Sequence, residues 1–303
     1  MHGYIFDIKH FAVHDGDGIR TTVFMKGCSM KCIWCHNPES ICSHHQLGYL
    51  AHKCAHCGRC AEVCPNGAHT LDAGHTHHFD RTKCLYCGKC EAACRSKALT
   101  LYGKHVSAEE IMPDIMKDVD FYESTGGGVT LSGGEALLQK EFCLELLKLA
   151  KAEGLNTAVD TCGFVGVKTF EDVLPYVDTF LYDLKHMDSE AHRRLTGQPN
   201  ELILDNLRMI TEKGAKIEIR MPLVPDHNDS PENLHAMGRF LKDLKGITRI
   251  KVLPYHEFAR TKYTSLGMED TMPRVRIPDN DDLKAAVDIL CSYGLNAVSG
   301  KEA

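Results

Sequence analysis

Apolar runs alternate with amphipathic segments along most of the chain. Runs that begin at residues 21, 129, 156, 179, 216 and 249 are almost continuously apolar, which is typical of parallel strands buried on both faces. The segment 140–154 repeats apolar positions at helical spacing and closes on a glycine. Six strand–helix units of this kind predict an α/β fold with an open, partial (β/α)6 TIM-like barrel, since a closed barrel of this type needs eight units.

Polar side chains follow the carboxyl ends of these predicted strands. Parallel α/β folds keep their active sites at that end. A single polar residue at the end of a strand needs no functional explanation, because strands commonly meet loops there. Six such residues at the same end of the sheet are poorly explained in this way. The candidate site residues are Glu135, Asp160, Asp183, Lys185, Arg220 and His256. We interpret Met221 and Tyr255, at the same ends, as packing residues.

A segment of different character interrupts the pattern after the first strand. Between residues 42 and 102 helical and strand periodicity fade, and Cys, Gly, His and Lys dominate. We therefore expect a barrel formed by residues 1–41 and 103–303, with a small domain inserted at 42–102. After the insert, a helix is predicted to begin at Ser107, a suitable N-cap that Glu109 and Glu110 follow.

Charge and composition exclude several classes of function. The 35 basic and 41 acidic residues give a net charge of −6, whereas a nucleic-acid-binding domain is normally basic. No stretch approaches the roughly 18 apolar residues of a membrane helix. The N-terminus lacks the apolar region of a secretory signal. These features predict a cytoplasmic protein without a nucleic-acid or membrane partner.

Cysteine is the unusual component of this chain. There are 15 cysteines, and twelve of them lie between residues 28 and 94. The count is odd, and a disulfide framework would not crowd its cysteines into a quarter of a large chain. The pattern therefore favours metal binding over disulfides.

The insert contains two near copies of one cysteine motif. Each copy reads C-x2-C-x2-C-x3-C, and a proline follows the first, which is the pattern of bacterial ferredoxins with two [4Fe–4S] clusters. In that pattern the fourth cysteine of each run binds the other cluster. We expect one cluster on Cys54, Cys57, Cys60 and Cys94, and the other on Cys84, Cys87, Cys90 and Cys64. Zinc, which also uses C-x2-C pairs, is the alternative.

A ferredoxin-like insert of this size has almost no apolar core. Loss of iron is therefore expected to unfold it. We interpret the nearby histidines as solvated loop residues, and a further metal site is the less favoured alternative for His44, His45, His69, His75, His77 and His78. Cys42 fits neither cysteine run and is expected to be a free thiol.

Three further cysteines precede the insert in the stretch GCSMKCIWCHNPES. Cys28, Cys32 and Cys35 are spaced C-x3-C-x2-C and leave the fourth iron of a [4Fe–4S] cube without a protein ligand. An open coordination position is a property of catalytic metal centres, whereas structural centres fill it. This stretch resembles the signature of the radical S-adenosylmethionine (SAM) enzymes. A miscellaneous metal site is the alternative for the three cysteines alone.

The resemblance narrows to the activating enzymes of glycyl radical enzymes, the relatives of pyruvate formate-lyase activating enzyme. It covers nearly the whole chain, through HDGDGIRTTVF, GCSMKCIWCHNPES, GGGVTLSGGEALLQ, AVDTCGF, FLYDLKHMD, EIRMPLVPDHND and VLPYHEFARTKY. The two-cluster insert is similar to that of the subgroup that activates glycyl radical dehydratases, decarboxylases and lyases. One departure is Asp17, where many members have proline; this concerns the stiffness of that loop rather than the chemistry.

The resemblance implies both a cofactor set and a reaction. One catalytic and two auxiliary [4Fe–4S] clusters would act with SAM, and reductive cleavage of SAM would yield methionine and a 5′-deoxyadenosyl radical. That radical would abstract a hydrogen atom from a backbone glycine of a partner glycyl radical enzyme and leave as 5′-deoxyadenosine. A flavodoxin or ferredoxin would supply electrons through the insert.

The resemblance also implies roles for individual residues. Cys28, Cys32 and Cys35 would hold the catalytic cluster, and Asp160 would lie at a monovalent cation near the SAM carboxylate. The residues implied to contact SAM are Trp34, Cys35, His36, Gly133, Gly134, Glu135, Asp183, Leu184, Lys185, Arg220 and His256. Two alternative functions are a radical SAM enzyme that acts on another substrate and an iron–sulfur electron carrier; an electron carrier would not explain the three-cysteine site.

Overall fold

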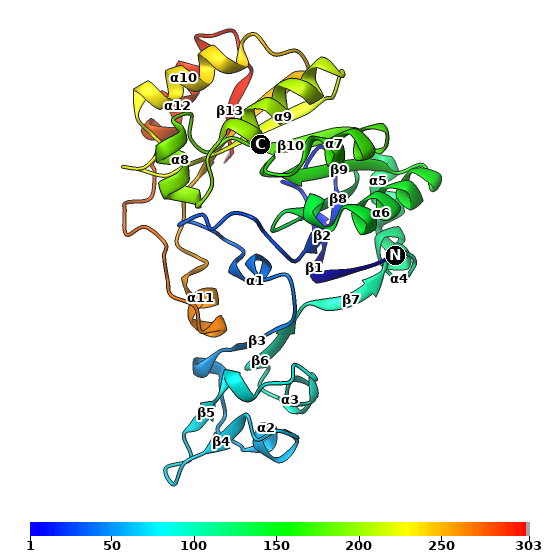
Figure 1. Ribbon diagram of the computed structural model, residues 1–303, viewed down its shortest axis with the longest axis vertical. Coiled ribbons are helices and arrows are strands. Elements are labelled where there is room, and N and C mark those ends of the chain that lie inside the picture. The colour runs from blue at the N-terminus through cyan, green and yellow to red at the C-terminus, as the bar shows by residue number, and fades with distance from the viewer. Residues whose placement is uncertain (301–303) are drawn as a thin grey trace.

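The computed structural model describes residues 1–300, and its centre is one nine-stranded sheet. The sheet order is β13-β12-β11-β10-β9-β8-β2-β1-β7 (Figure 1). All neighbours from β2 to β13 pair in parallel, whereas β1 is antiparallel to both β2 and β7. The strands are β1 (His2–Ala12), β2 (Arg20–Met25), β7 (Lys104–Ser107), β8 (Gly128–Gly133), β9 (Asn156–Thr161), β10 (Thr179–Asp183), β11 (Ile217–Leu223), β12 (Ile247–Pro254) and β13 (Ala297–Ser299).

The predicted α/β fold is confirmed, and the parallel strands provide its framework. Each of the six predicted strands lies in the parallel part of the sheet. The short strand β13 adds a seventh parallel member that the apolar pattern did not predict. Since β13 and β7 lie at opposite ends of the strand order, the sheet is open, as expected for a partial barrel.

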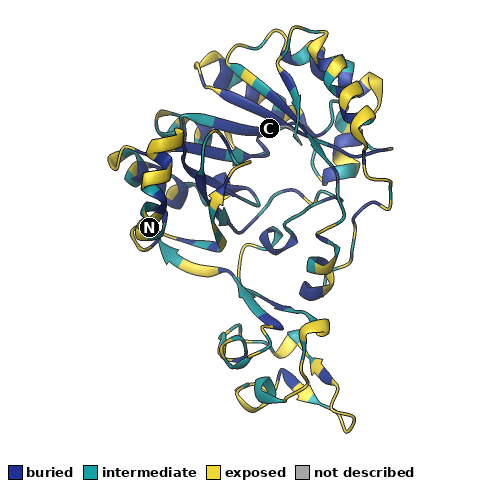
Figure 2. Cartoon of the chain, turned by 180° about the vertical axis from the view of Figure 1, so that it is seen from behind, coloured by how far each residue is buried: buried dark blue, intermediate teal, exposed yellow. Residues whose placement is uncertain are grey.

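Helices connect the strands and bury their apolar faces against the sheet. Side chains from α4, α6, α7, α9, α10 and α12 join those of the strands in one large core, and buried residues concentrate along the sheet (Figure 2). The helices are α1 (Pro38–Ile41), α4 (Ala108–Ile115), α5 (Val119–Thr125), α6 (Lys140–Ala152), α7 (Val167–Val173), α8 (Ser189–Thr196), α9 (Glu201–Glu212), α10 (Pro231–Leu241), α11 (Arg260–Leu266) and α12 (Asn280–Cys291). Short 3₁₀ turns lie at Ala51–Lys53, Arg81–Lys83, Met116–Asp118, Ala136–Gln139 and Leu174–Tyr176.

The sequence signals that predicted the start of helix α4 and the end of helix α6 are both found in the structure. The Ser107 side chain accepts from the backbone N–H of Glu110, whose carboxylate accepts from the N–H of Ser107, so that both satisfy N-terminal donors of α4. Just beyond α6, Gly154 has a positive φ of 74°, a conformation that glycine adopts without strain. These local signals set where the helices begin and end.

Arg20 in the HDGDGIR stretch holds the middle of the sheet together. Its guanidinium is buried and donates to Thr130 Oγ1 at 2.7 Å, to the Val129 carbonyl at 2.7 Å and to Asn156 Oδ1 at 3.0 Å. These partners lie on β8 and β9, so one side chain from β2 joins three strands. This part of the family motif therefore stabilises the barrel.

Residues 46–102 form a separate small unit beyond one end of the sheet (Figure 1). It contains two two-stranded antiparallel sheets, β3 with β6 and β4 with β5. Its buried apolar core consists of Leu47, Cys90 and Leu99, which is very small beside that of the barrel. The elements are β3 (Gln46–Tyr49), α2 (Arg59–Glu62), β4 (His69–Leu71), β5 (His77–Phe79), α3 (Lys89–Ala93) and β6 (Leu99–Tyr102).

Candidate active site

A cavity of about 240 Å³ lies at the carboxyl ends of the parallel strands. Its walls come from the loop after β2 and from the ends of β8, β9, β10, β11 and β12. The structure brings most of the sequence-predicted site residues together on these walls. Those that line the cavity are Cys28, Cys32, Trp34, Cys35, His36, Gly133, Gly134, Asp160, Asp183, Lys185 and Arg220.

The loop that carries the three cysteines is fixed by backbone hydrogen bonds. The N–H of Glu135 donates to the Gly27 carbonyl at 2.8 Å, and the N–H of Ile33 donates to the Leu195 carbonyl at 3.0 Å. A Cβ on Gly134 would lie 2.3 Å from the Gly27 carbonyl oxygen, so only glycine allows this close approach. The glycine pair after β8 therefore positions the cysteine loop as well as one wall of the cavity.

The cavity holds a fourth thiol that sequence reasoning missed. Cys162, just after β9, is buried, and its thiol hydrogen-bonds to Cys28. This hydrogen bond lowers the pKa of Cys28 and, with burial, raises the pKa of Cys162. Burial raises the pKa of Cys32 and raises that of Cys35 to about 12. Cys28 is therefore the thiol most readily ionised by this environment.

Two acid–base pairs give the cavity a mixed charge. Lys185 pairs with Asp183, which raises the pKa of Lys185 although burial opposes its charge. Arg220 lies 3.7 Å from Asp160, measured from Nη1 to Oδ2, and donates to the His14 carbonyl at 2.6 Å. Burial raises the pKa of Asp160 to about 6, against the effect of Arg220. Cations and anions side by side suit a zwitterionic ligand.

Glu135 and Leu184 do not contribute side chains to this cavity. The Glu135 carboxylate is completely buried and accepts from Thr161 Oγ1 at 2.8 Å and from the Cys162 N–H at 2.8 Å. Leu184 lies in the core with 2% exposure. Of Gly133, Gly134 and Glu135, which the resemblance implies as SAM contacts, only the two glycines line the cavity. The carboxylate instead joins β8 to the end of β9.

His256 reaches the site through His36. The two imidazoles stack with ring centroids 3.9 Å apart, and His36 Nε2 lies 3.1 Å from the His256 carbonyl oxygen. Burial lowers the pKa of His36 to about 4, so this stack is uncharged at neutral pH. His256 does not line the cavity itself. Met221 and Tyr255 are both buried, as interpreted from the sequence, although Tyr255 also forms part of the cavity wall.

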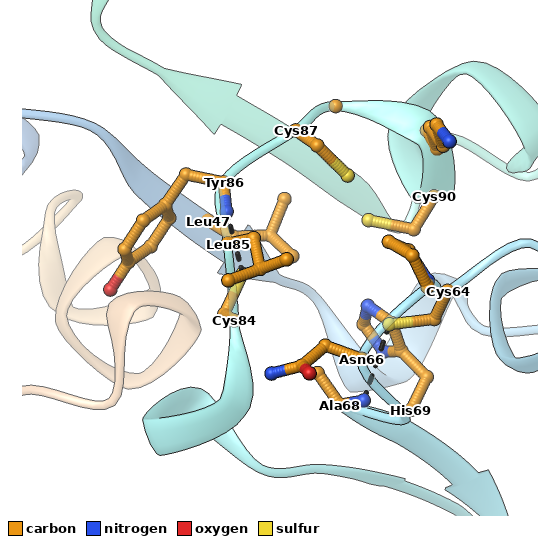
Figure 3. A pocket seen from close by; sticks show the side chains of 13 residues that line it. Leu47, Cys64, Asn66, Ala68, His69, Cys84, Leu85, Tyr86, Cys87 and Cys90 are labelled. Carbon is orange, nitrogen blue, oxygen red and sulfur yellow. Dashed lines mark hydrogen bonds between the residues drawn. The ribbon is translucent and has the colours of Figure 1, made fainter.

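The insert brings its eight motif cysteines together in two pockets, in the combinations that the spacing predicts. Figure 3 shows one pocket, in which Cys64 from the first run faces three cysteines of the second run. In the other pocket, Cys94 from the second run lies with three cysteines of the first run. The two sets are Cys64, Cys84, Cys87 and Cys90, and Cys54, Cys57, Cys60 and Cys94.

Comparison with known proteins gives the family. Residues 81–237 match the Radical SAM superfamily, and residues 53–102 match the 4Fe-4S dicluster domain family. The choline trimethylamine-lyase activating enzyme of Oleidesulfovibrio alaskensis is 43% identical over 88% of this chain and 87% of its own. The trans-4-hydroxy-L-proline dehydratase activating enzyme of Clostridioides difficile is 40% identical over 94% of each chain. The chain belongs to the radical SAM activating enzymes of glycyl radical enzymes.

A solved structure supports the same family for the barrel. A domain of pyruvate-formate lyase-activating enzyme from Bacteroides vulgatus is 33% identical, with a TM-score of 0.50 over 57% of this chain and 98% of its own. The predicted family and function are thus confirmed: this activating enzyme uses iron–sulfur clusters and SAM to activate a glycyl radical enzyme. Among residues 1–300, no helix is long and apolar enough to span a membrane.

Helix α11 of the activating enzyme supports the cysteine loop, and sequence reasoning missed this support. Lys262 Nζ donates to the His36 carbonyl at 2.9 Å and to Glu39 Oε1 at 2.7 Å. The Tyr263 hydroxyl donates to the Cys35 carbonyl at 3.0 Å. The only signal in the sequence was the match of HEFARTKY to the family, which names no partner for these side chains.

Two insert histidines correct the interpretation of solvated loop residues. His69 and His77 are only 2% and 6% exposed, and His69 Nδ1 lies 2.9 Å from His77 Nε2. Burial lowers the pKa of His69 to about 4. They face inward because side chains alternate along each strand, which places His69 and His77 on the same face of the β4–β5 hairpin, opposite to the exposed Thr70 and His78. His69 and His77 each line one of the two cysteine pockets. His75 and His78, at and beyond the turn of this hairpin, are exposed as expected.

Proposed function

We propose that this activating enzyme holds three [4Fe–4S] clusters: a catalytic cluster on Cys28, Cys32 and Cys35, and two auxiliary clusters in the insert. The supporting observation is that the eight motif cysteines of the insert form two sets of four, each at its own pocket, while the three cysteines of the loop after β2 lie with Cys162 at a third cavity. When bound, the catalytic cluster and SAM supply a 5′-deoxyadenosyl radical that removes a hydrogen atom from a glycine of the partner enzyme.

The charged residues of the cavity are suited to hold SAM beside the three cysteines. Arg220 and Lys185 are buried cations that can face the carboxylate of SAM. Asp160 and Asp183 are suited to its ammonium group or to a monovalent cation near Asp160. Trp34, His36 and, through its stack on His36, His256 bound the other side. Glu135 and Leu184 would contribute through the backbone alone, since their side chains point into the core.

The insert is proposed to carry electrons from a flavodoxin or ferredoxin to the catalytic cluster. We place its boundaries at residues 42 and 102, with the barrel formed by residues 1–41 and by the second segment, predicted as 103–303, of which 301–303 lie outside the described residues. The two separate sheets within 46–102 support this division. The 15 free thiols of the chain suit a reducing compartment, which we take to be the cytoplasm.

The decisive experiment counts iron and sulfide and records EPR spectra of the anaerobically reconstituted chain, before and after SAM is added. We expect about twelve irons, four for each cluster, and a cluster signal that changes with SAM. About eight irons and a signal that ignores SAM would leave only the insert clusters. That result would contradict the catalytic site and favour an electron carrier.

A further inference from the structure

The two halves of the insert are equivalent positions of one repeat. Cys54 and Cys84 open the two cysteine runs, so that counterparts lie thirty positions apart. The backbone repeats as well: His56 and Tyr86 have φ of 51° and 52°, and the glycines that follow have 77° and 74°. Each side chain at one cysteine pocket therefore has an identifiable counterpart at the other.

The backbone treats both pockets alike. The N–H groups of His56 and Tyr86 each donate to the first cysteine of their run at 3.4 Å. Those of Ala68 and Ala98 donate to the last cysteine at 3.2 and 3.3 Å. Any difference in hydrogen bonding between the two clusters must therefore come from side chains.

The side chains between the pockets differ in a systematic way. Leu47 lines the pocket of Cys84, and its counterpart His77 lines the pocket of Cys54. Leu99 lines the pocket of Cys54, and its counterpart His69 lines that of Cys84, where Figure 3 shows it beside Cys64. Each of these two pairs of equivalent positions therefore holds one leucine and one histidine, and the two histidines hydrogen-bond to each other. Burying imidazoles where leucines fit is unfavourable unless their nitrogens find partners.

The hydrogen bond between the histidines fixes where their protons lie. In the 2.9 Å contact between His69 Nδ1 and His77 Nε2, one nitrogen donates and the other accepts. Nδ1 of His77 is buried and has no partner within the described residues. The sulfur of Cys60 lies within 4.8 Å of a ring nitrogen of each histidine. His77 lines the pocket of Cys54, where a bound cluster would offer only thiolate and sulfide acceptors. We therefore assign a proton to Nδ1 of His77, and in this tautomer His69 donates to Nε2.

We propose that His77, held in this tautomer by His69, donates a hydrogen bond to the cluster on Cys54, Cys57, Cys60 and Cys94 and makes it easier to reduce than its partner cluster. The inference rests on the proposed auxiliary clusters. A donor to a cluster sulfur stabilises the more negative, reduced form. The shared proton leaves one histidine N–H for the two clusters, so they cannot be equivalent.

Two further differences between the halves of the insert also favour reduction of the cluster on Cys54, Cys57, Cys60 and Cys94. Arg59 Nε donates to the Cys57 sulfur at 3.3 Å, and the position of Arg59 is taken by Lys89 in the other half. Tyr49, which carries a hydroxyl, lines the pocket of Cys54, and its counterpart Phe79 has no hydroxyl. The cluster on the first run therefore collects side-chain donors.

The test is an EPR-monitored redox titration of the reconstituted full chain and of H77L, which places at this position the leucine found in the other half. We expect unchanged iron and, for one insert cluster, about a tenfold lower ratio of reduced to oxidised form at a fixed potential, a shift of about 59 mV for a one-electron couple. H78L is the matched control, because His78 is the exposed neighbour paired with Asp72; its titration should match that of the unaltered chain.

Equal titration curves for H77L and the unaltered chain, at full iron content, would overturn the inference. A second measurement covers the case in which H77L loses its clusters. Pulsed EPR of the unaltered chain with histidine ¹⁵N-labelled only at the ring nitrogens should show nitrogen coupling at one reduced insert cluster, and its absence would also overturn the inference. A chain with no insert clusters would overturn the proposed function itself, and the iron count separates that outcome from the others.

Discussion

The four thiols of the cavity illustrate how neighbouring residues of one type acquire different properties. Cys28, Cys32 and Cys35 come from one loop, whereas Cys162 lies just after β9 and hydrogen-bonds to Cys28. The three loop cysteines have the C-x3-C-x2-C spacing, which Cys162 does not share. We therefore propose that the iron binds the three loop cysteines, which leaves one coordination position open for SAM.

Replacement of single cysteines tests this assignment. C32A should lose SAM cleavage and retain about eight of about twelve irons, because only one of three clusters loses a ligand. C162A should retain all of the iron and lose SAM cleavage by about 10- to 100-fold, the usual effect of removing a hydrogen bond to a ligand. Iron analysis and the yield of 5′-deoxyadenosine with dithionite measure both. Loss of iron in C162A equal to that in C32A would identify Cys162 as a fourth ligand.

Most cavity residues could be predicted because their type and position carry information independent of the rest of the chain. Asp160 and Arg220 are charged residues at the ends of apolar strands, where solvent or a ligand must receive them. Cys162 and Lys262 could not be predicted in this way. Lys262 contacts the His36 carbonyl across 226 positions of sequence, and no local pattern specifies such a contact. The direction of the Glu135 carboxylate depends on β9 for the same reason.

At the scale of elements, strands were predictable when they were long and buried on both faces. β8 to β12 are almost continuous apolar runs, and their order along the sheet follows their order in sequence. The three residues of β13 are too few to form such a run. The short helix α11 has no strong apolar stripe, and its importance comes from the two polar side chains that it directs at the cysteine loop.

Removing the cation of α11 should therefore weaken SAM binding without unfolding the barrel. In K262M the Glu39 carboxylate, 6% exposed, loses its partner, and the carbonyl of His36 loses a charged donor. Since a hydrogen bond to a charged group contributes about 1.5–3 kcal/mol, we expect about a tenfold increase in the KM for SAM. Steady-state kinetics of SAM cleavage measure this increase. K284M, which removes an exposed cation from α12, is the control and should leave the KM unchanged.

At the scale of the whole molecule, the barrel and the insert are stabilised in different ways. The barrel has a large apolar core that strands and helices share. The insert has an apolar cluster of only three buried residues, Leu47, Cys90 and Leu99, and otherwise surrounds its two cysteine pockets. A unit with so little apolar burial depends on its metal for folding.

Removal of iron should accordingly unfold one part of the chain and leave the other folded. After anaerobic chelation, backbone amides of residues 46–102 should exchange with deuterium much faster than in the loaded protein. Amides of β8 to β11 should remain protected, because their hydrogen bonds lie within the barrel core. Equal loss of protection in both parts would show that the insert and barrel fold as one cooperative unit.

The position of the insert also predicts how activity depends on the source of electrons. C57A should reduce activation by a protein donor far more than SAM cleavage driven by dithionite, which can reach the catalytic cluster directly. The two assays on one preparation give this ratio. C291S, which changes an exposed cysteine on α12, should affect neither. An equal loss in both assays would indicate that the insert is a structural support and not an electron relay.

The Arg81 side chain connects the insert to the barrel. Arg81 of the insert donates to the Leu47 carbonyl and to the Ser265 carbonyl, both at 2.5 Å, and Ser265 belongs to α11. Helix α11 in turn holds the cysteine loop through Lys262 and Tyr263. These contacts give the insert a fixed position relative to the cysteine loop, so the distance that an electron would travel from the insert to that loop is set by Arg81 and α11 and not by chance encounters of two mobile parts.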